Sequence, residues 1–219
     1  RTWDDSSFTQ TRAAVVAAGH TIQPASAITP AGLATVGTYI IFEPTTAPTA
    51  GELTALAAFV SGGGQLVVFG ESSATPAVMT AIVAGSGGSM TWGASLNTTT
   101  VVLASPFSST PNNIVGQPLA TSVGWTVAGG TPFLTNGYGS FQTVGAGRIV
   151  AFADRRDFNF GSTVNTGLMV NIIGAAAGPG PAPATATQVP TLTDVGIALM
   201  IAFLAVAAGL HLRRRDRMV

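Results

Sequence analysis

An apolar stretch near the end of the chain constrains its fold more than any other feature. Residues 195–212 form a run of 18 residues without Asp, Glu, Lys or Arg, and Arg213, Arg214, Arg215 and Arg217 follow it. As an α-helix this run would be about 27 Å long at ~1.5 Å per residue, close to the ~30 Å hydrocarbon layer of a bilayer. We therefore expect one transmembrane helix, with the arginines as its stop-transfer signal in the cytoplasm and the preceding residues outside.

Two other interpretations of this stretch are weaker. A buried core helix can also be apolar on all sides, but core helices seldom run this far without a charge and then end on a cluster of arginines. A tail that is exchanged for a lipid anchor would also combine small residues, a spacer and an apolar end. The terminal arginines argue against that second alternative.

The residues before the apolar run carry a motif. Val189, Pro190, Thr191 and Leu192 precede Asp194, and together with the apolar run and the arginines they resemble the IPTL-type C-terminal sorting signal of Gram-negative bacteria, a relative of the PEP-CTERM signals. The family's usual first residue is isoleucine, and its usual aromatic residue after the acid is absent here. The resemblance implies export, anchoring in the membrane, cleavage near the motif by an exosortase-type membrane enzyme, and delivery to the cell surface or matrix.

The charge balance and the lack of cysteine exclude several function classes. All nine basic residues are arginine, and they balance nine carboxylates. Without the tail, residues 1–188 hold five arginines and seven carboxylates, which gives no basic footprint for nucleic acid. The chain has no cysteine, so disulfides, thiolate metal sites and a cysteine nucleophile are absent.

The first half of the chain alternates between helical and extended patterns. Thr49 and Glu52 have the spacing of a capping box, and a helical apolar pattern follows them. Short apolar runs flank this segment. In chain order we predict a helix over residues 4–18, an extended piece at 21–22, a strand over 39–42, a helix over 49–61, a strand over 66–69 and a helix over 75–83. Strands that alternate with helices through short links indicate right-handed crossovers and a parallel sheet.

The second half of the chain is richer in Gly, Ser, Thr and Asn. We predict irregular β-structure over residues 85–144, with short extended pieces at 100–103 and 124–127. Further predicted elements are a hairpin of residues 141–144 and 148–153, a helix over residues 164–176 and a Pro-rich linker over residues 177–188. The chain thus divides into an exported domain of residues 1–176, the linker, and the sorting signal of residues 189–219.

Residues 53–69 and 144–154 carry a second resemblance. Their pattern resembles the flavodoxin-like domains related to class I glutamine amidotransferases, which implies an α/β fold with a parallel sheet and, here, a β-rich insertion. Those domains begin with a central strand, so the resemblance implies a further strand upstream of Arg1. The enzymes of that family carry a catalytic cysteine after the strand that matches residues 66–69, whereas Glu71, Ser72 and Ser73 stand there in this chain. Amidotransferase chemistry is therefore not expected.

A serine nucleophile is also not expected. His20 is the only histidine outside the apolar tail run, and it follows the first predicted helix. A helix in such a fold runs back along the sheet, so His20 would lie at the amino ends of the strands while Ser72 and Ser73 lie at their carboxyl ends. A serine–histidine pair is then geometrically excluded, and we predict no catalytic residues.

Acidic residues gather where predicted strands end. The six are Asp4, Asp5, Glu43, Glu71, Asp154 and Asp157. Open α/β sheets bind ligands at that edge, so one hypothesis is a divalent cation or a hydroxyl-rich ligand such as a sugar, assisted by Arg155 and Arg156. The interpretation that we favour is that these acids cap the helices that follow. We likewise interpret residues 155–157 as a solvated loop with local charge pairs.

These observations predict a non-catalytic protein of the cell surface or matrix. It is expected to need no cofactor, apart from the divalent cation of the first hypothesis. Its expected partners are the lipid bilayer, an exosortase-type enzyme and either surface glycans or copies of itself. One alternative is a repurposed hydrolase that uses the sheet-edge carboxylates. Another is a subunit of a surface layer or filament, which the low charged fraction of 8% would suit.

Overall fold

The computed structural model describes residues 8–24, 27–71, 73–155 and 163–175. The chain divides into two units, Arg1–Ala182 and Pro183–Val219, and all of the described residues belong to the first. The division falls inside the predicted linker, residues 177–188. That linker, the sorting motif and the predicted transmembrane helix lie outside the described residues.

The described unit is an α/β structure in which helices and strands alternate early and strands dominate later. In chain order its elements are α1 (Thr9–Ala17), α2 (Pro30–Leu33), β1 (Thr38–Phe42), α3 (Ala50–Ser61), β2 (Gln65–Phe69), α4 (Pro76–Gly85), β3 (Thr91–Val101), β4 (Pro118–Ala128), β5 (Thr131–Leu134), the 3₁₀ turn η2 (Thr135–Gly137), β6 (Gly139–Val144), β7 (Gly147–Phe152) and α6 (Thr163–Gly174). The α/β class that the sequence predicts is confirmed.

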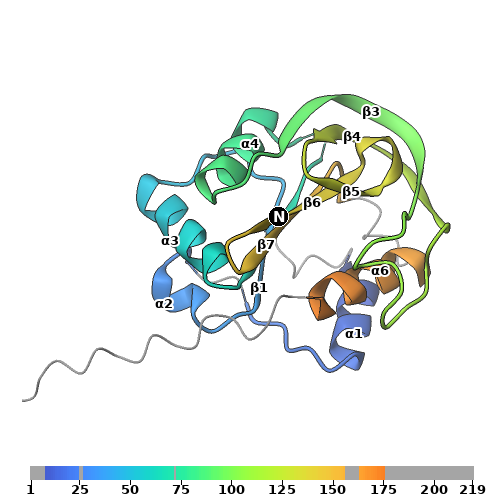
Figure 1. The fold of residues 1–219 in the computed structure, drawn as a ribbon, viewed down its shortest axis with the longest axis horizontal. Coiled ribbons are helices and arrows are strands. Elements are labelled where there is room, and N and C mark those ends of the chain that lie inside the picture. Colours follow the sequence, from blue (N-terminus) through green and yellow to red (C-terminus); the bar gives the residue numbers. More distant parts are fainter. Residues whose placement is uncertain (1–7, 25–26, 72, 156–162, 176–219) are drawn as a thin grey trace, which may run out of the picture. The chain divides into compact units, whose positions relative to one another are not determined.

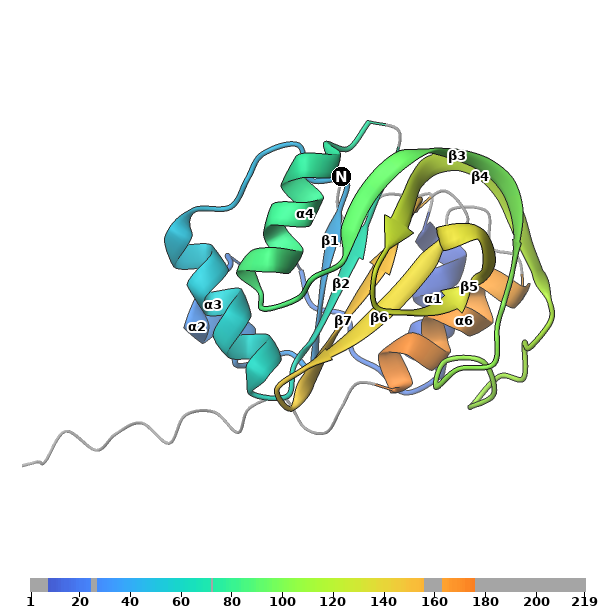
Figure 2. The same ribbon diagram turned by 45° about the horizontal axis from the view of Figure 1, so that its top comes forward.

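A five-stranded sheet forms the centre of this unit, in the order β1-β2-β7-β6-β5. β1, β2 and β7 are parallel, whereas β6 and β5 are antiparallel additions. Helices α2, α3 and α4 lie on one side of the sheet, and α1 and α6 lie on the other (Figures 1 and 2). The sheet is therefore mixed, and the prediction of a parallel sheet holds only for the three strands that crossovers connect.

The middle strand of the parallel set is the most buried part of the sheet. Every residue of β2 is buried, from Gln65 to Phe69, as expected for a strand with helices on both faces. β1 and β7 each pair with β2 without a break in register, so no further strand fits between β1 and β2. Within the described residues, a further strand could join this sheet only at the outer edge of β1 or of β5.

The helices begin and end where local signals place them. The side-chain oxygen of Thr49 accepts from the Glu52 N–H at 3.3 Å, and the Glu52 carboxylate accepts from the Thr49 N–H at 2.7 Å, which completes the predicted capping box of α3. Gly19 follows α1 with a φ of +90°, in the region that favours glycine. The predicted helices over residues 75–83 and 164–176 correspond to α4 and α6, with shifts of one or two residues at their ends.

Two local features differ from the predicted pattern. Residues 21–22, predicted as an extended piece, lie outside the helices and strands and join no sheet. The short helix α2 was not predicted, although its signal is present in the sequence: Thr29 caps it by accepting from the Gly32 N–H at 3.1 Å, and Pro30 is its first residue. A helix of four residues carries too short an apolar pattern to be recognised by periodicity.

The predicted irregular region is more regular than expected. β3 and β4 are strands of 11 residues each that pair antiparallel as a separate two-stranded sheet, with breaks in register near Gly93 and Thr99. We call this pair the β3–β4 arm. It curves over the carboxyl ends of the parallel strands (Figure 2). Its Gly, Ser and Thr content hides the strand pattern, because few of its residues are apolar enough to alternate visibly.

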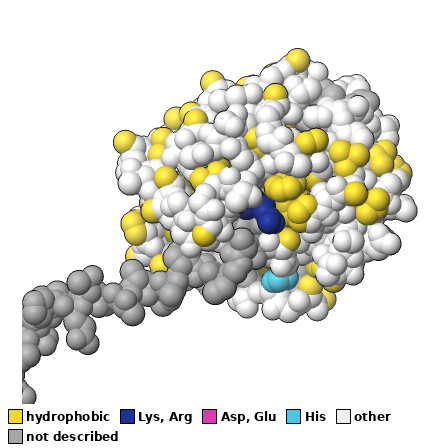
Figure 3. Space-filling view, in the orientation of Figure 1, with side chains coloured by type: hydrophobic (Ala, Val, Ile, Leu, Met, Phe, Trp, Pro, Cys, Tyr) yellow, Lys and Arg dark blue, Asp and Glu magenta, His cyan; other side chains and the backbone are white. Residues whose placement is uncertain are grey.

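One face of this unit carries few charged side chains. The face shown in Figure 3 carries few basic or histidine side chains among scattered apolar ones, and no carboxylate is visible on it. Scattered apolar side chains are ordinary on soluble surfaces.

No helix within residues 8–24, 27–71, 73–155 and 163–175 has the length and apolar character needed to cross a membrane. The stretch of residues 195–212, for which a transmembrane helix is expected, is not among them.

A pair of glycine substitutions tests the packing of the hairpin against α3. A Cβ on Gly147 would lie 2.1 Å from the Val60 carbonyl oxygen, whereas a Cβ on Gly51, inside α3, would meet nothing within 4 Å. We expect Gly147→Ala to lower the free energy of unfolding by about 1–3 kcal/mol. Gly51→Ala should raise it by about 0.5–1 kcal/mol, because alanine favours a helix. Urea titration of both variants would measure this, and equal effects of the two would contradict the packing.

The capping box predicts a pH dependence. The hydrogen bonds from the backbone and side chain of Thr49 lower the pKa of Glu52 from its usual 4.5. A lowered pKa in the folded chain means that the Glu52 charge stabilises the fold above pH 4.5 and that this contribution is lost as the pH falls through the lowered pKa. The stability difference between the chain and Glu52→Gln, followed by urea unfolding, should therefore vanish in acid. A difference that persists unchanged at pH 2–3 would contradict this account.

Candidate functional site at the carboxyl ends of the parallel strands

The carboxyl ends of three parallel strands bring acidic residues together. Phe42, Phe69 and Phe152 are the last residues of β1, β2 and β7, and they are direct neighbours in the register of the sheet. Glu43 follows β1 at once, and Glu71 follows β2 after one glycine. Asp154 follows β7 after Ala153, so the structure places Glu43, Glu71 and Asp154 at the strand ends where the sequence places them.

A row of phenylalanine rings lies directly below these acids. The Phe42 and Phe69 rings stack with centroids 5.0 Å apart, and the Phe69 and Phe152 rings stack at 4.6 Å. Phe8 extends the row at one end, with its ring centroid 4.8 Å from that of Phe42. All four rings are buried, so they form an apolar surface at the strand ends that Glu43 and Glu71 follow.

Arg155 lies between two of the carboxylates. Its guanidinium forms an ion pair with Glu43, and its Nε lies 3.9 Å from Oε2 of Glu71. The side chains are only 6%, 9% and 13% exposed for Arg155, Glu43 and Glu71. The guanidinium carbon also lies 6.0 Å from the centre of the Phe8 ring. The prediction that Arg155 belongs to a solvated loop is therefore wrong, because this residue is buried in an ion-pair cluster.

The backbone at Glu43 is turned into an uncommon conformation. Glu43 has a φ of +46°, in the left-handed region that residues with a Cβ rarely adopt, at a cost of about 1–3 kcal/mol. Its N–H still donates to the Phe69 carbonyl at 3.1 Å, so the turn begins only after the sheet hydrogen bonds are complete. The Ser73 hydroxyl donates to Oε2 of Glu43 at 3.3 Å. The strained turn thus directs the carboxylate back towards Arg155 and Ser73.

The β3–β4 arm contacts the backbone next to the ion-pair cluster. Trp125 in β4 donates its backbone N–H to the Ala153 carbonyl at 3.2 Å and its indole N–H to the Glu71 carbonyl at 2.8 Å. Gly124 makes this approach feasible, because a Cβ there would lie 2.4 Å from the Ala153 oxygen. The arm therefore rests on the ends of β2 and β7 with its backbone in direct contact.

The remaining predicted site residues have different outcomes. Asp154 is fully buried beside Arg155. Asp4, Asp5, Arg156, Asp157 and Ser72 lie outside the described residues, as do the sorting motif and the stop-transfer arginines. Within the part of the chain that the structure describes, no group of three or more His, Asp or Glu side chains is arranged to hold a metal ion. The divalent cation stays a prediction.

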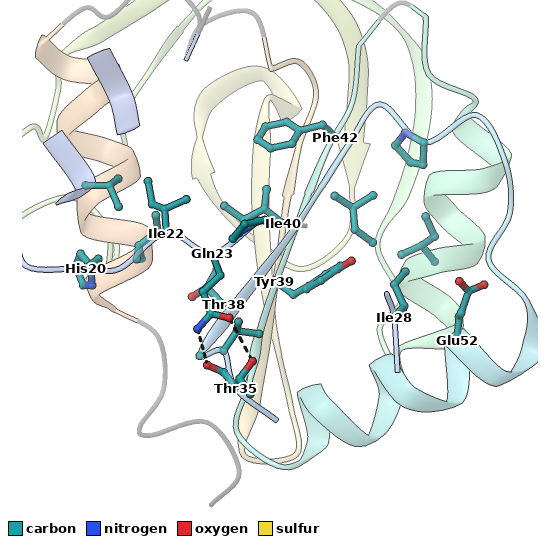
Figure 4. Close-up of a pocket in the computed structure, with 18 of the residues that line it drawn as sticks. His20, Ile22, Gln23, Ile28, Thr35, Thr38, Tyr39, Ile40, Phe42 and Glu52 are labelled. Atoms are coloured by element: carbon teal, nitrogen blue, oxygen red, sulfur yellow. Dashed lines mark hydrogen bonds between the residues drawn. The ribbon is translucent and has the colours of Figure 1, made fainter. Parts of the chain in front are cut away.

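His20 and Ser73 lie at opposite ends of the strands. The His20 ring lies beside the end of α6 in the pocket shown in Figure 4, and its Nε2 is 3.8 Å from where a Cβ on Gly174 would be. Ser73 contacts Glu43 at the carboxyl ends of the strands. The structure thus keeps Ser73 and His20 apart.

The sequence did not reveal the ion pairs of Arg155. The only signal is its position directly after a strand, and this places the backbone but not the side chain.

Comparisons of the chain with protein-family models and with curated proteins found no match.

Removal of Arg155 tests the cluster. In Arg155→Met two largely buried carboxylates lose the arginine that pairs with them, so we expect the free energy of unfolding to fall by about 3–5 kcal/mol. The matched control is the triple variant with Glu43→Gln and Glu71→Gln added, which removes all three charges and should recover most of this loss. Urea unfolding measures both. A loss below about 1 kcal/mol in the single variant, as for an exposed pair, would contradict the burial of the cluster.

Proposed function

We propose that this chain is an exported protein of the bacterial cell surface or matrix, anchored and processed through residues 189–219. Its α/β domain has a binding or structural role and is not catalytic. The observation that carries the non-catalytic part is the ion-pair cluster. At the edge where α/β sheets usually bind ligands, Glu43 and Glu71 already engage Arg155, under the β3–β4 arm. These carboxylates are held in place by the chain itself.

We further infer that the domain is a variant of the flavodoxin-like fold. Three parallel strands with helices on both faces support this inference. The antiparallel strands β5 and β6 and the β3–β4 arm are the additions that distinguish the variant. In this view the turn after β2 corresponds to the catalytic turn of the amidotransferases but lacks their cysteine nucleophile.

The case for export and anchoring comes from the sequence. The run of residues 195–212 matches the thickness of a bilayer, and the four arginines after it resist translocation. The motif before it marks the expected cleavage point for an exosortase-type enzyme. Glycan binding, self-assembly and hydrolysis by the sheet-edge carboxylates stay predictions, because no contact within the described residues favours one of them.

Mass spectrometry of the mature protein tests the processing. In a Gram-negative host with an exosortase-type enzyme, we expect the secreted chain to end close to Pro190. Substitution of Pro190 and Thr191 by alanine should leave the full tail in the membrane fraction. The matched control replaces Thr185 and Thr187 in the linker by alanine and should be processed normally. An intact Val219 in the native chain would contradict processing, and full-length protein dissolved in the cytosol would contradict export.

A further inference from the structure

A single Asn-Gly pair lies in the turn that joins β5 to β6. Asn136 and Gly137 belong to η2, and no other asparagine of the chain precedes a glycine. Such a pair is chemically reactive. The backbone nitrogen of the residue after an asparagine can attack the side-chain Cγ, and a glycine at that position has no side chain to obstruct the approach. The sequence therefore supplies the reactants of a spontaneous modification, and the fold decides whether they meet.

The reaction is deamidation, and water is its only other reactant. The Gly137 nitrogen forms a bond to Cγ of Asn136, and the bond from Cγ to the side-chain nitrogen breaks. That nitrogen leaves as ammonia and carries away the proton of the Gly137 amide, so a cyclic succinimide remains. Water then opens the ring at either carbonyl, which gives aspartate or its isomer isoaspartate at this position.

The folded turn exposes Asn136 but keeps the two reacting atoms apart. Asn136 is exposed to solvent, with a φ of 60° and a ψ of 23°, and Gly137 follows with a φ of +68°. Asparagine adopts this left-handed region more readily than most residues. At this ψ the Gly137 nitrogen lies on the opposite side of the Cα–C bond from Cβ of Asn136, so it points away from Cγ. The turn must therefore open before the ring can close.

The Asn136 side chain also ties the turn to β3. Its Nδ2 donates to the Thr99 carbonyl at 2.9 Å. Next to it, the Thr135 hydroxyl accepts from the Val101 N–H at 2.9 Å, and the buried Thr100 hydroxyl donates to the Thr135 carbonyl at 3.0 Å. These hydrogen bonds hold the last residues of β3 against η2. The first of them depends on a side-chain N–H that deamidation removes.

Both products of the reaction weaken this contact. A carboxylate at position 136 has no N–H to donate, so its oxygen faces the Thr99 carbonyl as a second acceptor. Isoaspartate also routes the backbone through the former side chain and lengthens it by a CH₂ group, just before the fully buried Tyr138 and the start of β6 at Gly139. The modified turn thus fits less well against β3, and the β3–β4 arm loses one of its attachments.

We propose that Asn136 is a site of spontaneous deamidation whose rate is set by opening of the η2 turn, and that its conversion detaches the end of β3 from this turn. An exposed Asn-Gly pair, a backbone conformation that withholds the attacking nitrogen and a hydrogen bond that the product cannot make support this together. The modification is distinct from the binding or structural role proposed above, and neither that role nor export enters it.

Peptide mass spectrometry of the full chain tests the reaction. The chain is incubated in detergent micelles in mildly alkaline buffer, with and without urea. The internal control is Asn113, which is exposed like Asn136 but precedes Ile114. In urea we expect Asn136 to convert at least about tenfold faster than Asn113, because the branched isoleucine obstructs ring closure. Without urea Asn136 should still convert, but at least about tenfold more slowly than in urea, because the turn must open first.

Two variants test the consequence for β3. Asn136→Asp mimics one product, and Asn136→Gly removes the side chain but keeps the left-handed backbone. We expect Asn136→Asp to speed hydrogen exchange of the Val101 amide several-fold, and Asn136→Gly to speed it less, because no carboxylate then faces Thr99. If Asn136→Asp does not fold, the chain deamidated in the first experiment replaces it, since its added negative charge separates it from unmodified chain by ion exchange.

Several results would overturn the proposal. For the reaction, these are similar rates at Asn136 and Asn113 in urea, equal rates at Asn136 with and without urea, or no conversion of Asn136 in the folded chain while the unfolded chain converts fully. For the release of β3, the result is a Val101 amide that exchanges equally fast in the chain and in both variants. All of these measurements use purified protein, so they leave the test of export and processing untouched.

Discussion

Parallel pairing of β2 with β1 on one side and β7 on the other is the constraint on which the rest of the structure depends. It buries β2 on both faces and brings the final phenylalanines of three strands into one stacked row. The residues that follow those phenylalanines therefore lie close together at one edge of the sheet. The positions of Glu43, Glu71, Asp154 and Arg155 all follow from this arrangement.

Carboxylates brought so close together require a counterion, and the chain provides its own. Arg155 pairs with Glu43 and Glu71, the Glu43 backbone is strained to make the contact, and Trp125 fixes the Glu71 carbonyl. Removing one partner of such a buried pair lowers the free energy of unfolding by more than forming the pair raises it. Single substitutions in the cluster are therefore destabilising. The edge at which open α/β sheets usually bind ligands thus serves here to tie the strands and the β3–β4 arm together.

The sequence predicted the features that local signals encode. The apolar runs of β1 and β2, the capping box of Thr49 and Glu52, and the hairpin of β6 and β7 were all placed correctly, and the acids at strand ends followed from them. The ion pairs of Arg155 join residues far apart in sequence, and the outer position of β1 depends on strand order. No local pattern encodes either, so both had to come from the structure.

Residue-by-residue amide hydrogen exchange of the full chain without ligand tests the central claim most directly. If β1 is bonded to β2 in the parallel register, the Tyr39 and Ile41 amides face β2 and exchange slowly. Fast exchange of both amides in the folded chain would contradict the account, because it would mean that β1 is not paired with β2.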